Sequence, residues 1–136
     1  MLQVLDPPPE DVVDAIAEGI SRHNSRDSVL RENFAIVKRR GGGRLVGGVT
    51  ASVSFSILFI NNIWVDEVDR LTGIGSELMI AAENEGRKRQ AKTACVDTLS
   101  SQAPEFYEKL GYVEFGRLEG EAGGKRLDRI WFRKPL

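Results

Sequence analysis

The sequence has little of the chemistry on which many enzymes and secreted proteins depend. It contains one cysteine, Cys95, and one histidine, His23, in 136 residues. A single cysteine excludes a disulfide within the chain and suits a reducing compartment, so we expect a cytoplasmic protein. No group of histidine, cysteine and carboxylate residues has the spacing of metal ligands, so no metal site is expected.

Strong net charge and long apolar runs are also missing. The formal net charge is −1, which gives no global reason to bind nucleic acid or an anionic membrane. The longest apolar stretch, residues 56–65, is broken by Asn61 and Asn62 and is too short to span a bilayer. The N-terminal residues lack the pattern of a signal peptide. We therefore expect no membrane partner.

The residues that are present predict one compact domain over residues 1–136. Hydrophobic residues make up 41% and charged residues 29% of the chain, as in ordinary globular proteins. Apolar residues recur at helical spacing over 9–23 and 73–88. Closely spaced strands between these helices predict an antiparallel meander. Its strands are expected at 34–37, 45–55 and 57–65, with a hairpin tip at 39–44.

The remaining pattern adds a strand-helix-strand step and a second antiparallel pair. Gly111 stands where a helix is expected to end in a left-handed cap. The expected elements are a strand at 93–98, a helix at 101–110, and strands at 112–117 and 126–132, joined by a connection at 119–125. This order predicts an α/β fold with a mixed α+β sheet rather than a doubly wound one.

Charged turns offer two candidate anion sites. The hairpin tip carries Lys38, Arg39, Arg40 and Arg44. No aromatic residues are interleaved with them, so we interpret the tip as a solubilising turn, with nucleic-acid contact as the alternative. The second turn, after Val65, has an R-x-x-G-x-G pattern at Arg70, Gly73 and Gly75.

The second turn has the properties of a diphosphate site. Amides in a first helical turn lack intrahelical acceptors, and the helix dipole adds positive charge. Glycines admit a bulky diphosphate, and Arg70 can neutralise it. The alternative is a tight turn in which glycine only permits the bend. The turn is neither a Walker A loop nor G-x-G-x-x-G, which disfavours an NTP or a dinucleotide.

Two segments resemble the GNAT acyltransferase superfamily. The first, Ile63–Leu78, places R-x-x-G-x-G five residues after a strand that ends in Val65. The second, Ala103–Tyr112, resembles A-x-x-x-Y-x-x-x-G-[FY]. Both occur in the family order with a strand between them, and the order of elements over 9–132 is similar to the family fold. The closest resemblance is to a branch of small bacterial members.

The resemblance implies a mostly antiparallel central sheet, flanked by helices, in which the strands near Val65 and Val96 are parallel and splay apart. The pantetheine arm of acetyl-CoA would enter between them. The tyrosine that protonates the thiolate would be Tyr107, with a core aromatic as the alternative. The expected acetyl-CoA residues are Trp64, Val65, Arg70, Leu71, Thr72, Gly73, Ile74, Gly75, Ser76, Ser100 and Tyr107.

Two departures from the family pattern affect the cofactor site. Leu71 and Thr72 replace the usual Gly-Lys type pair, which removes one flexible residue and one phosphate-facing cation. Ser100 stands where many members have asparagine. For the general base, Asp66 and Glu67 at the end of the central strand are the first candidates, with a solvated turn as the alternative. Asp97 and His23 are further candidates.

We therefore predict an acyltransferase that moves an acetyl group from acetyl-CoA to an amine by direct attack. The acceptor is expected to be a small-molecule or peptide amine, and nucleic acid is not an expected partner. A homodimer through an exposed last strand is a further expectation. The alternative function is a non-catalytic acyl-CoA-binding or protein-interaction module.

Overall fold

The computed structural model describes residues 1–25 and 30–136. The chain forms two compact units, Met1–Leu30 and Arg31–Leu136. The first contains α1 (Glu10–Ser25), which confirms the helix predicted from its apolar spacing. No helix among the described residues is both long and apolar enough to cross a membrane. The prediction of a single domain over 1–136 stays a prediction.

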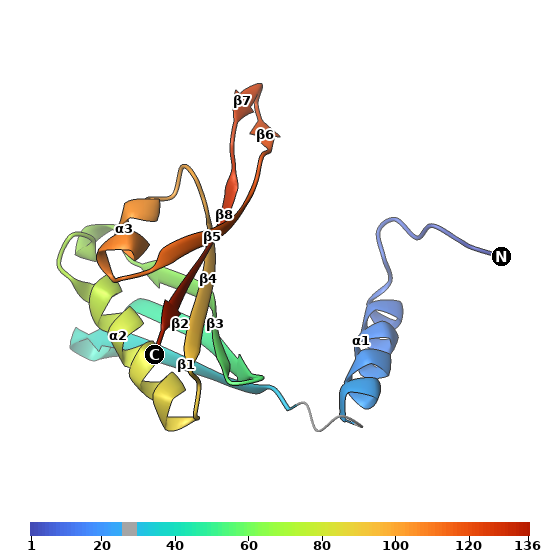
Figure 1. The fold of residues 1–136 in the computed structure, drawn as a ribbon, viewed down its shortest axis with the longest axis horizontal. Coiled ribbons are helices and arrows are strands. Elements are labelled where there is room, and N and C mark those ends of the chain that lie inside the picture. The colour runs from blue at the N-terminus through green and yellow to red at the C-terminus, as the bar shows by residue number, and fades with distance from the viewer. Residues whose placement is uncertain (26–29) are drawn as a thin grey trace. The chain divides into compact units, whose positions relative to one another are not determined.

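The second unit is built on a six-stranded mixed sheet with the order β1-β2-β3-β4-β8-β5 (Figure 1). The pair β3 and β4 is parallel, and the other neighbours are antiparallel. This confirms the predicted mixed sheet. The strands are β1 (Glu32–Arg40), β2 (Arg44–Ser54), β3 (Ile57–Val65), β4 (Thr93–Leu99), β5 (Val113–Leu118) and β8 (Arg129–Pro135).

Strands β3 and β4 pair over only part of their length. Their pairing runs from Ile57 opposite Thr93 to Ile60 opposite Val96 and then stops. At this point the register between β3 and β2 also shifts, which leaves Asn61 as an extra residue in β3. Such a bulge bends a strand and increases its twist. The two strands therefore diverge where a polar residue interrupts the apolar run.

Helices α2 (Ile74–Lys88) and α3 (Pro104–Lys109) lie on the same face of the sheet (Figure 1). Gly86 of α2 approaches Leu58 so closely that a Cβ there would lie 3.0 Å from its side chain. Tyr107 of α3 packs against Phe132 of β8, with 5.9 Å between ring centroids. The sheet register places Leu58 and Phe132 on one face. Residues on the opposite face, such as Phe59 and Trp131, are half-buried.

Several predicted boundaries were wrong near the C-terminus. The helix predicted at 101–110 begins only at Pro104, because Ala103 is left-handed (φ 58°) and Pro104 opens the helix. The connection predicted at 119–125 contains a small hairpin of β6 (Glu121–Ala122) and β7 (Lys125–Arg126). The last strand, predicted to begin at 126, begins at Arg129.

The position of the last strand removes one argument for dimerisation. We expected that strand to be exposed, but β8 lies between β4 and β5 and pairs with both. The edges of the sheet are β1 and β5. A last strand that is paired on both sides has no free backbone edge to offer a second copy.

Candidate active site

A cleft of about 640 Å³ lies where β3 and β4 diverge. One wall comes from the end of β3, the other from Thr98 of β4 and from the segment that leads into α3. Arg70 and Leu71 close one end. The lining residues are Ile63, Trp64, Val65, Arg70, Leu71, Gly75, Thr98, Gln102, Ala103, Phe106 and Tyr107.

Strand β3 presents to this cleft a backbone edge that pairs with no other strand. The Asp66 N–H donates to the Val46 carbonyl of β2 at 2.8 Å. Backbone groups in a strand point alternately to its two neighbours, so the N–H and C=O of Val65 point away from β2. Strand β4 does not pair with β3 at this level. A bound amide can therefore hydrogen-bond to the edge at Val65 as an added strand would.

The turn after β3 leads into a helix whose first amides are available. Leu71 (φ 63°) and Gly73 (φ 86°) are both left-handed, and Gly73 is the N-cap of α2. The Glu77 N–H donates to the Gly73 carbonyl at 3.0 Å and begins the helical bonding. The amides of residues 74–76 therefore have no acceptor within the helix. This arrangement is suited to an anion.

A second cavity of about 310 Å³ lies against this turn and shares residues with the cleft. It is lined by Val65, Asp69, Arg70, Leu71, Gly73, Ile74, Gly75, Ser76 and Phe106. A Cβ at Gly75 would lie 3.2 Å from the Phe106 ring, so glycine allows α2 and α3 to approach closely here. The Nε of Arg70 donates to the Val65 carbonyl at 3.1 Å, which places this cation where the two cavities meet.

Tyr107 lines the cleft from α3 although it is 7% exposed. Its ring meets Phe106 and Tyr112 edge-on, with centroids 5.1 and 6.1 Å away. Burial, and then the negative charge of Asp97, raise the pKa of its phenol above the ordinary value. The phenol is thus a protonated donor at neutral pH, which suits a general acid.

A buried polar network fixes the neighbours of Tyr107. The Tyr112 hydroxyl donates to Glu83 of α2 at 2.8 Å, and Lys134 of β8 donates to the same carboxylate at 2.8 Å. Glu83 is only 3% exposed. Removing one partner of a buried charged group is costly, so the network resists displacement. The network connects Glu83 of α2 with Tyr112, which follows α3, and with Lys134 of β8, beside the Tyr107 ring.

The predicted general bases lie outside the cleft lining. The carboxylate of Asp66 accepts a hydrogen bond from Arg44 at 2.7 Å. Glu67 is exposed; its carbonyl accepts the Arg70 N–H at 3.4 Å, while its carboxylate makes no hydrogen bond or ion pair with another described residue. Asp97 is paired with Arg129. His23 lies exposed in α1, in the first unit. Within the described ranges, no group of His, Cys, Asp and Glu has an arrangement that could hold a metal ion.

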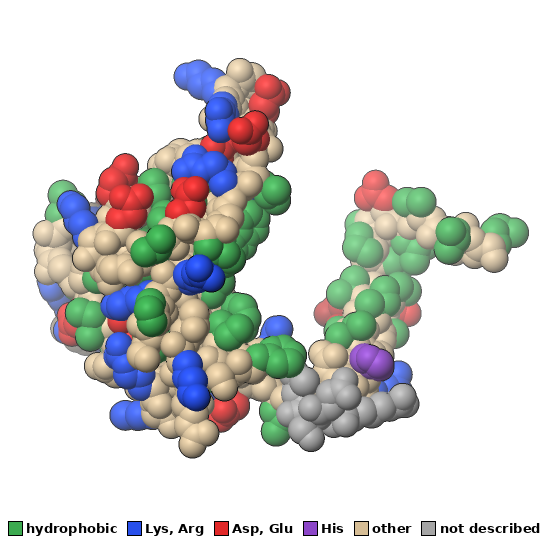
Figure 2. Space-filling model, in the orientation of Figure 1, with side chains coloured by type: hydrophobic (Ala, Val, Ile, Leu, Met, Phe, Trp, Pro, Cys, Tyr) green, Lys and Arg blue, Asp and Glu red, His purple; other side chains and the backbone are tan. Residues whose placement is uncertain are grey.

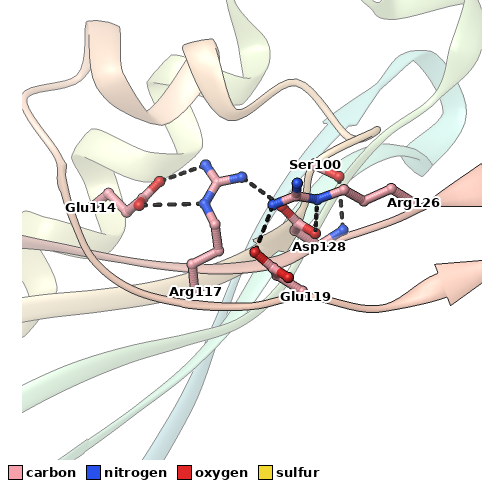
Figure 3. Close-up of polar contacts among 6 residues, drawn as sticks. All are labelled: Ser100, Glu114, Arg117, Glu119, Arg126 and Asp128. Carbon is pink, nitrogen blue, oxygen red and sulfur yellow. Dashed lines mark hydrogen bonds and ion pairs between the residues drawn. The ribbon is translucent and has the colours of Figure 1, made fainter.

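Ser100, predicted to bind the cofactor, lines neither cavity and is bonded to Asp128, so its cofactor role stays a prediction. Its hydroxyl accepts the Asp128 N–H at 3.0 Å, and its own N–H donates to the Asp128 carbonyl at 2.8 Å (Figure 3). The Asp128 carboxylate receives Arg117 at 2.8 Å and Arg126 at 3.0 Å. Arg126 also reaches Glu119 (Figure 3). One buried carboxylate therefore connects the wall of the cleft to the base of the β6–β7 hairpin.

Comparison with known proteins identifies the family of this chain. A family model described as the acetyltransferase (GNAT) domain matches residues 30–114, more than half of the chain. This chain belongs to the GNAT acetyltransferase family. It is an N-acetyltransferase, and acetyl-CoA is the typical donor of its homologues.

Individual relatives agree with this assignment. An acetyltransferase of Agrobacterium fabrum is 28% identical over 119 residues, which are 88% of this chain and 83% of that protein. Blasticidin-S acetyltransferase of Streptomyces morookaense is 37% identical over 71 residues, 52% of each protein. A crystal structure of a Bacillus cereus acetyltransferase covers 98% of both chains, with a TM-score of 0.79 and 28% identity. An Agrobacterium tumefaciens structure has the same fold, with a TM-score of 0.86 and 24% identity over 100% of this chain and 98% of that one.

Five lining residues of the cleft in this GNAT acetyltransferase were not among the predicted site residues. They are Ile63, Thr98, Gln102, Ala103 and Phe106. Phe106 and Gln102 stand beside Tyr107 and Ala103 in the second motif, so their proximity was readable. Thr98 was assigned only to a strand. Which face of β4 borders the cleft depends on how β4 pairs with β3 and β8, and no local sequence pattern specifies that pairing.

The backbone of the turn predicts an order of mutational effects on acetyl-CoA affinity. A β-branched side chain in the left-handed region is strained, so Gly73→Val should open the turn and raise the acetyl-CoA Kd roughly tenfold to hundredfold. Arg70→Ala, which removes an exposed charge, should raise it less. Calorimetric titration of both variants measures this. The reverse order would show that charge outweighs amide geometry.

The Asp128 network predicts a pH-dependent stability. Hydrogen bonds from Arg126 and then Arg117 hold the pKa of Asp128 below its ordinary value. A group with a lowered folded-state pKa stabilises the fold above its unfolded pKa and loses this effect as the pH falls through the lowered value. The difference in unfolding free energy between wild type and Asp128→Asn should therefore be constant above about pH 5 and shrink below about pH 4.

Urea unfolding at pH 7, 5 and 3 measures this difference. Glu105→Gln, at an exposed carboxylate of α3, is the matched control. A difference for Asp128→Asn that persists unchanged to pH 3 would contradict an ionised Asp128 as the centre of the network.

Proposed function

We propose that this acetyltransferase transfers acetyl directly from acetyl-CoA to an amine in the cleft between β3 and β4. One observation carries the proposal: the open edge at Val65, the Tyr107 phenol and the amides of the α2 N-terminus border two cavities that share five lining residues. In this proposal the diphosphate lies at Arg70–Ser76, and the pantetheine arm runs along the open edge of β3 so that the thioester oxygen faces the Val65 N–H. The reaction takes place in the cytoplasm.

The chemistry requires three groups. The nitrogen of a neutral amine attacks the thioester carbonyl, and the Val65 N–H stabilises the charge that develops on its oxygen. As the tetrahedral intermediate collapses, a C–N bond has formed, the C–S bond breaks, and its electron pair stays on sulfur. Tyr107 donates its proton to the thiolate. The nitrogen loses its proton to water, and water returns a proton to the Tyr107 phenolate, so free CoA and the amide are released and the phenol is restored.

We assign the general base to Glu67, which accepts the amine proton through an intervening water molecule. Asp66 is less suited, because its carboxylate already accepts from Arg44 at 2.7 Å. The exposed carboxylate of Glu67 reaches solvent beside the end of β3. A base that acts through water needs no direct contact with the acceptor. Both residues lie in the turn between the two cavities and the β1–β2 hairpin.

The acceptor in this proposal is a small-molecule or peptide amine. The β6–β7 hairpin carries side chains of both signs, including Glu121 and Lys125, so it has no strong preference for one charge (Figure 2). Relatives are named for both acceptor types: one for blasticidin S, and a structure of the same fold for the alanine of a ribosomal protein. The homodimer stays a prediction. Analytical ultracentrifugation, which measures the mass of the protein in solution, tests it.

An acetyl-CoA-dependent thiol-release assay over a panel of small-molecule and peptide amines tests the function. We expect release of free CoA that saturates with both substrates for at least one amine class. Saturable acetyl-CoA binding without turnover on any amine would favour the non-catalytic module instead.

Tyr107→Phe tests the general acid. The ring stays in its aromatic cluster, so the acetyl-CoA Kd should change little, while kcat should fall by at least about a hundredfold. Phe132→Leu, in β8 against the Tyr107 ring, is a packing control that keeps the phenol and changes no lining residue of either cavity. A Tyr107→Phe enzyme with wild-type kcat would exclude Tyr107 as the proton donor.

A further inference from the structure

The β1–β2 hairpin contacts the turn that precedes the diphosphate loop. Arg40 Nη1 lies 2.8 Å from one Asp69 oxygen, and Arg44 Nη2 lies 3.3 Å from the other. Arg44 Nη1 also donates to Asp66 at 2.7 Å. The basic residues that we interpreted as a solubilising turn are thus paired with carboxylates of the loop region. They link the tip of one hairpin to the segment that follows β3.

Asp69 is held through each of its polar groups. Its N–H donates to the Asp66 carbonyl at 2.9 Å, and its own carbonyl accepts the Thr72 hydroxyl. Its carboxylate receives the two arginines, and its side chain is only 5% exposed. Asp69 is therefore a firmly held point directly before Arg70. Thr72, at a position where the family has a cation, is used to hold this point.

The loop after Asp69 needs such a fixed point. Leu71 is left-handed (φ 63°), a conformation that glycine adopts freely and leucine adopts only under constraint. Its side chain is fully exposed, so packing does not hold it there. Two residues later Gly73 is left-handed as well. The constraint must come from the ends of the turn, and Asp69 is the end before Leu71.

Asp69 also borders the cavity at the diphosphate loop. A carboxylate beside a diphosphate repels it unless its charge is neutralised. Arg40 and Arg44 neutralise Asp69 and Asp66, with two positive and two negative charges in one cluster. Simple electrostatics therefore predicts that removing the Asp69 charge would tighten acetyl-CoA binding. A structural role for this residue predicts the opposite.

We propose that Arg40, Arg44 and Asp69 form an arginine brace that positions the diphosphate loop for acetyl-CoA. The inference rests on the proposed placement of the diphosphate at Arg70–Ser76. The three residues are positioning residues, because they act through the backbone of the loop and not by touching the reacting atoms. The brace holds the amides of residues 74–76 in register with the diphosphate despite the strained Leu71.

Acetyl-CoA titration of Asp69→Asn distinguishes tighter binding, which simple electrostatics predicts, from weaker binding, which the brace predicts. The brace predicts a Kd about tenfold higher, the effect of losing one charge-assisted hydrogen bond. It also predicts a raised KM for acetyl-CoA with unchanged kcat and unchanged KM for the amine, a split that general destabilisation does not produce. Unchanged or tighter acetyl-CoA binding would overturn the brace and favour direct contact of the arginines with phosphate.

The hairpin supplies a matched control. Arg39 donates to the Gly43 carbonyl at 2.8 Å and takes no part in the brace. Arg39→Gln should therefore leave the acetyl-CoA Kd within about twofold, while Arg40→Gln and Arg44→Gln raise it about tenfold. If Asp69→Asn does not fold, Arg40→Gln carries the test, since Arg40 is half-exposed. Arg40→Lys, which keeps the charge, should restore most of the affinity.

The acetyl-CoA titrations give different results if only the brace is wrong and if the proposed function is wrong. Acetyl-CoA binding that is weakened by Gly73→Val but retained in all three brace variants would overturn the brace alone. Wild-type protein that does not bind acetyl-CoA would refute the proposed function and the brace together. Equal losses in Arg39→Gln and Arg40→Gln would also overturn the brace, since they would reflect the charge of the whole hairpin.

Discussion

The end of backbone pairing between β3 and β4 is the constraint on which the site depends. Buried N–H and C=O groups are costly when unpaired, so a sheet normally continues its ladder. Here the bulge at Asn61 turns β3 away from β4 after four paired residues on each strand. The edge at Val65 then faces a cleft rather than a strand. A cofactor with amide groups can complete this ladder, as the proposed function requires.

The aromatic packing around Tyr107 holds this side chain in the wall of the cleft. Phe106, Tyr112 and Phe132 pack against the ring. The Tyr112 hydroxyl in turn donates a hydrogen bond to the Glu83 carboxylate. Burial raises the pKa of the phenol above its ordinary value, which by itself already keeps a phenol protonated at neutral pH. The packing therefore matters because it positions the side chain at the cleft.

Charge in this protein is organised in pairs rather than in patches. The arginine brace and the Asp128 network each place two arginines around a carboxylate that is about 95% buried. Asp69 borders the cavity at the turn before α2, and Asp128 is bonded to Ser100 in the segment between β4 and α3. The net charge of −1 therefore conceals two local structures in which charge determines the position of the backbone.

The sequence by itself determined the mixed sheet, the order of its six strands along the chain and the glycine turn that opens α2, because these follow from local periodicity and from two short motifs. It placed Tyr107 correctly in a helix after β4 and placed Gly73 at the helix N-terminus. Only the tertiary structure decided what each charged residue contacts. Ser100 holds Asp128 rather than facing the cleft, and Arg40 reaches a carboxylate 29 residues away. Such contacts depend on strand register and on how hairpins lie beside distant turns, and no local pattern encodes these.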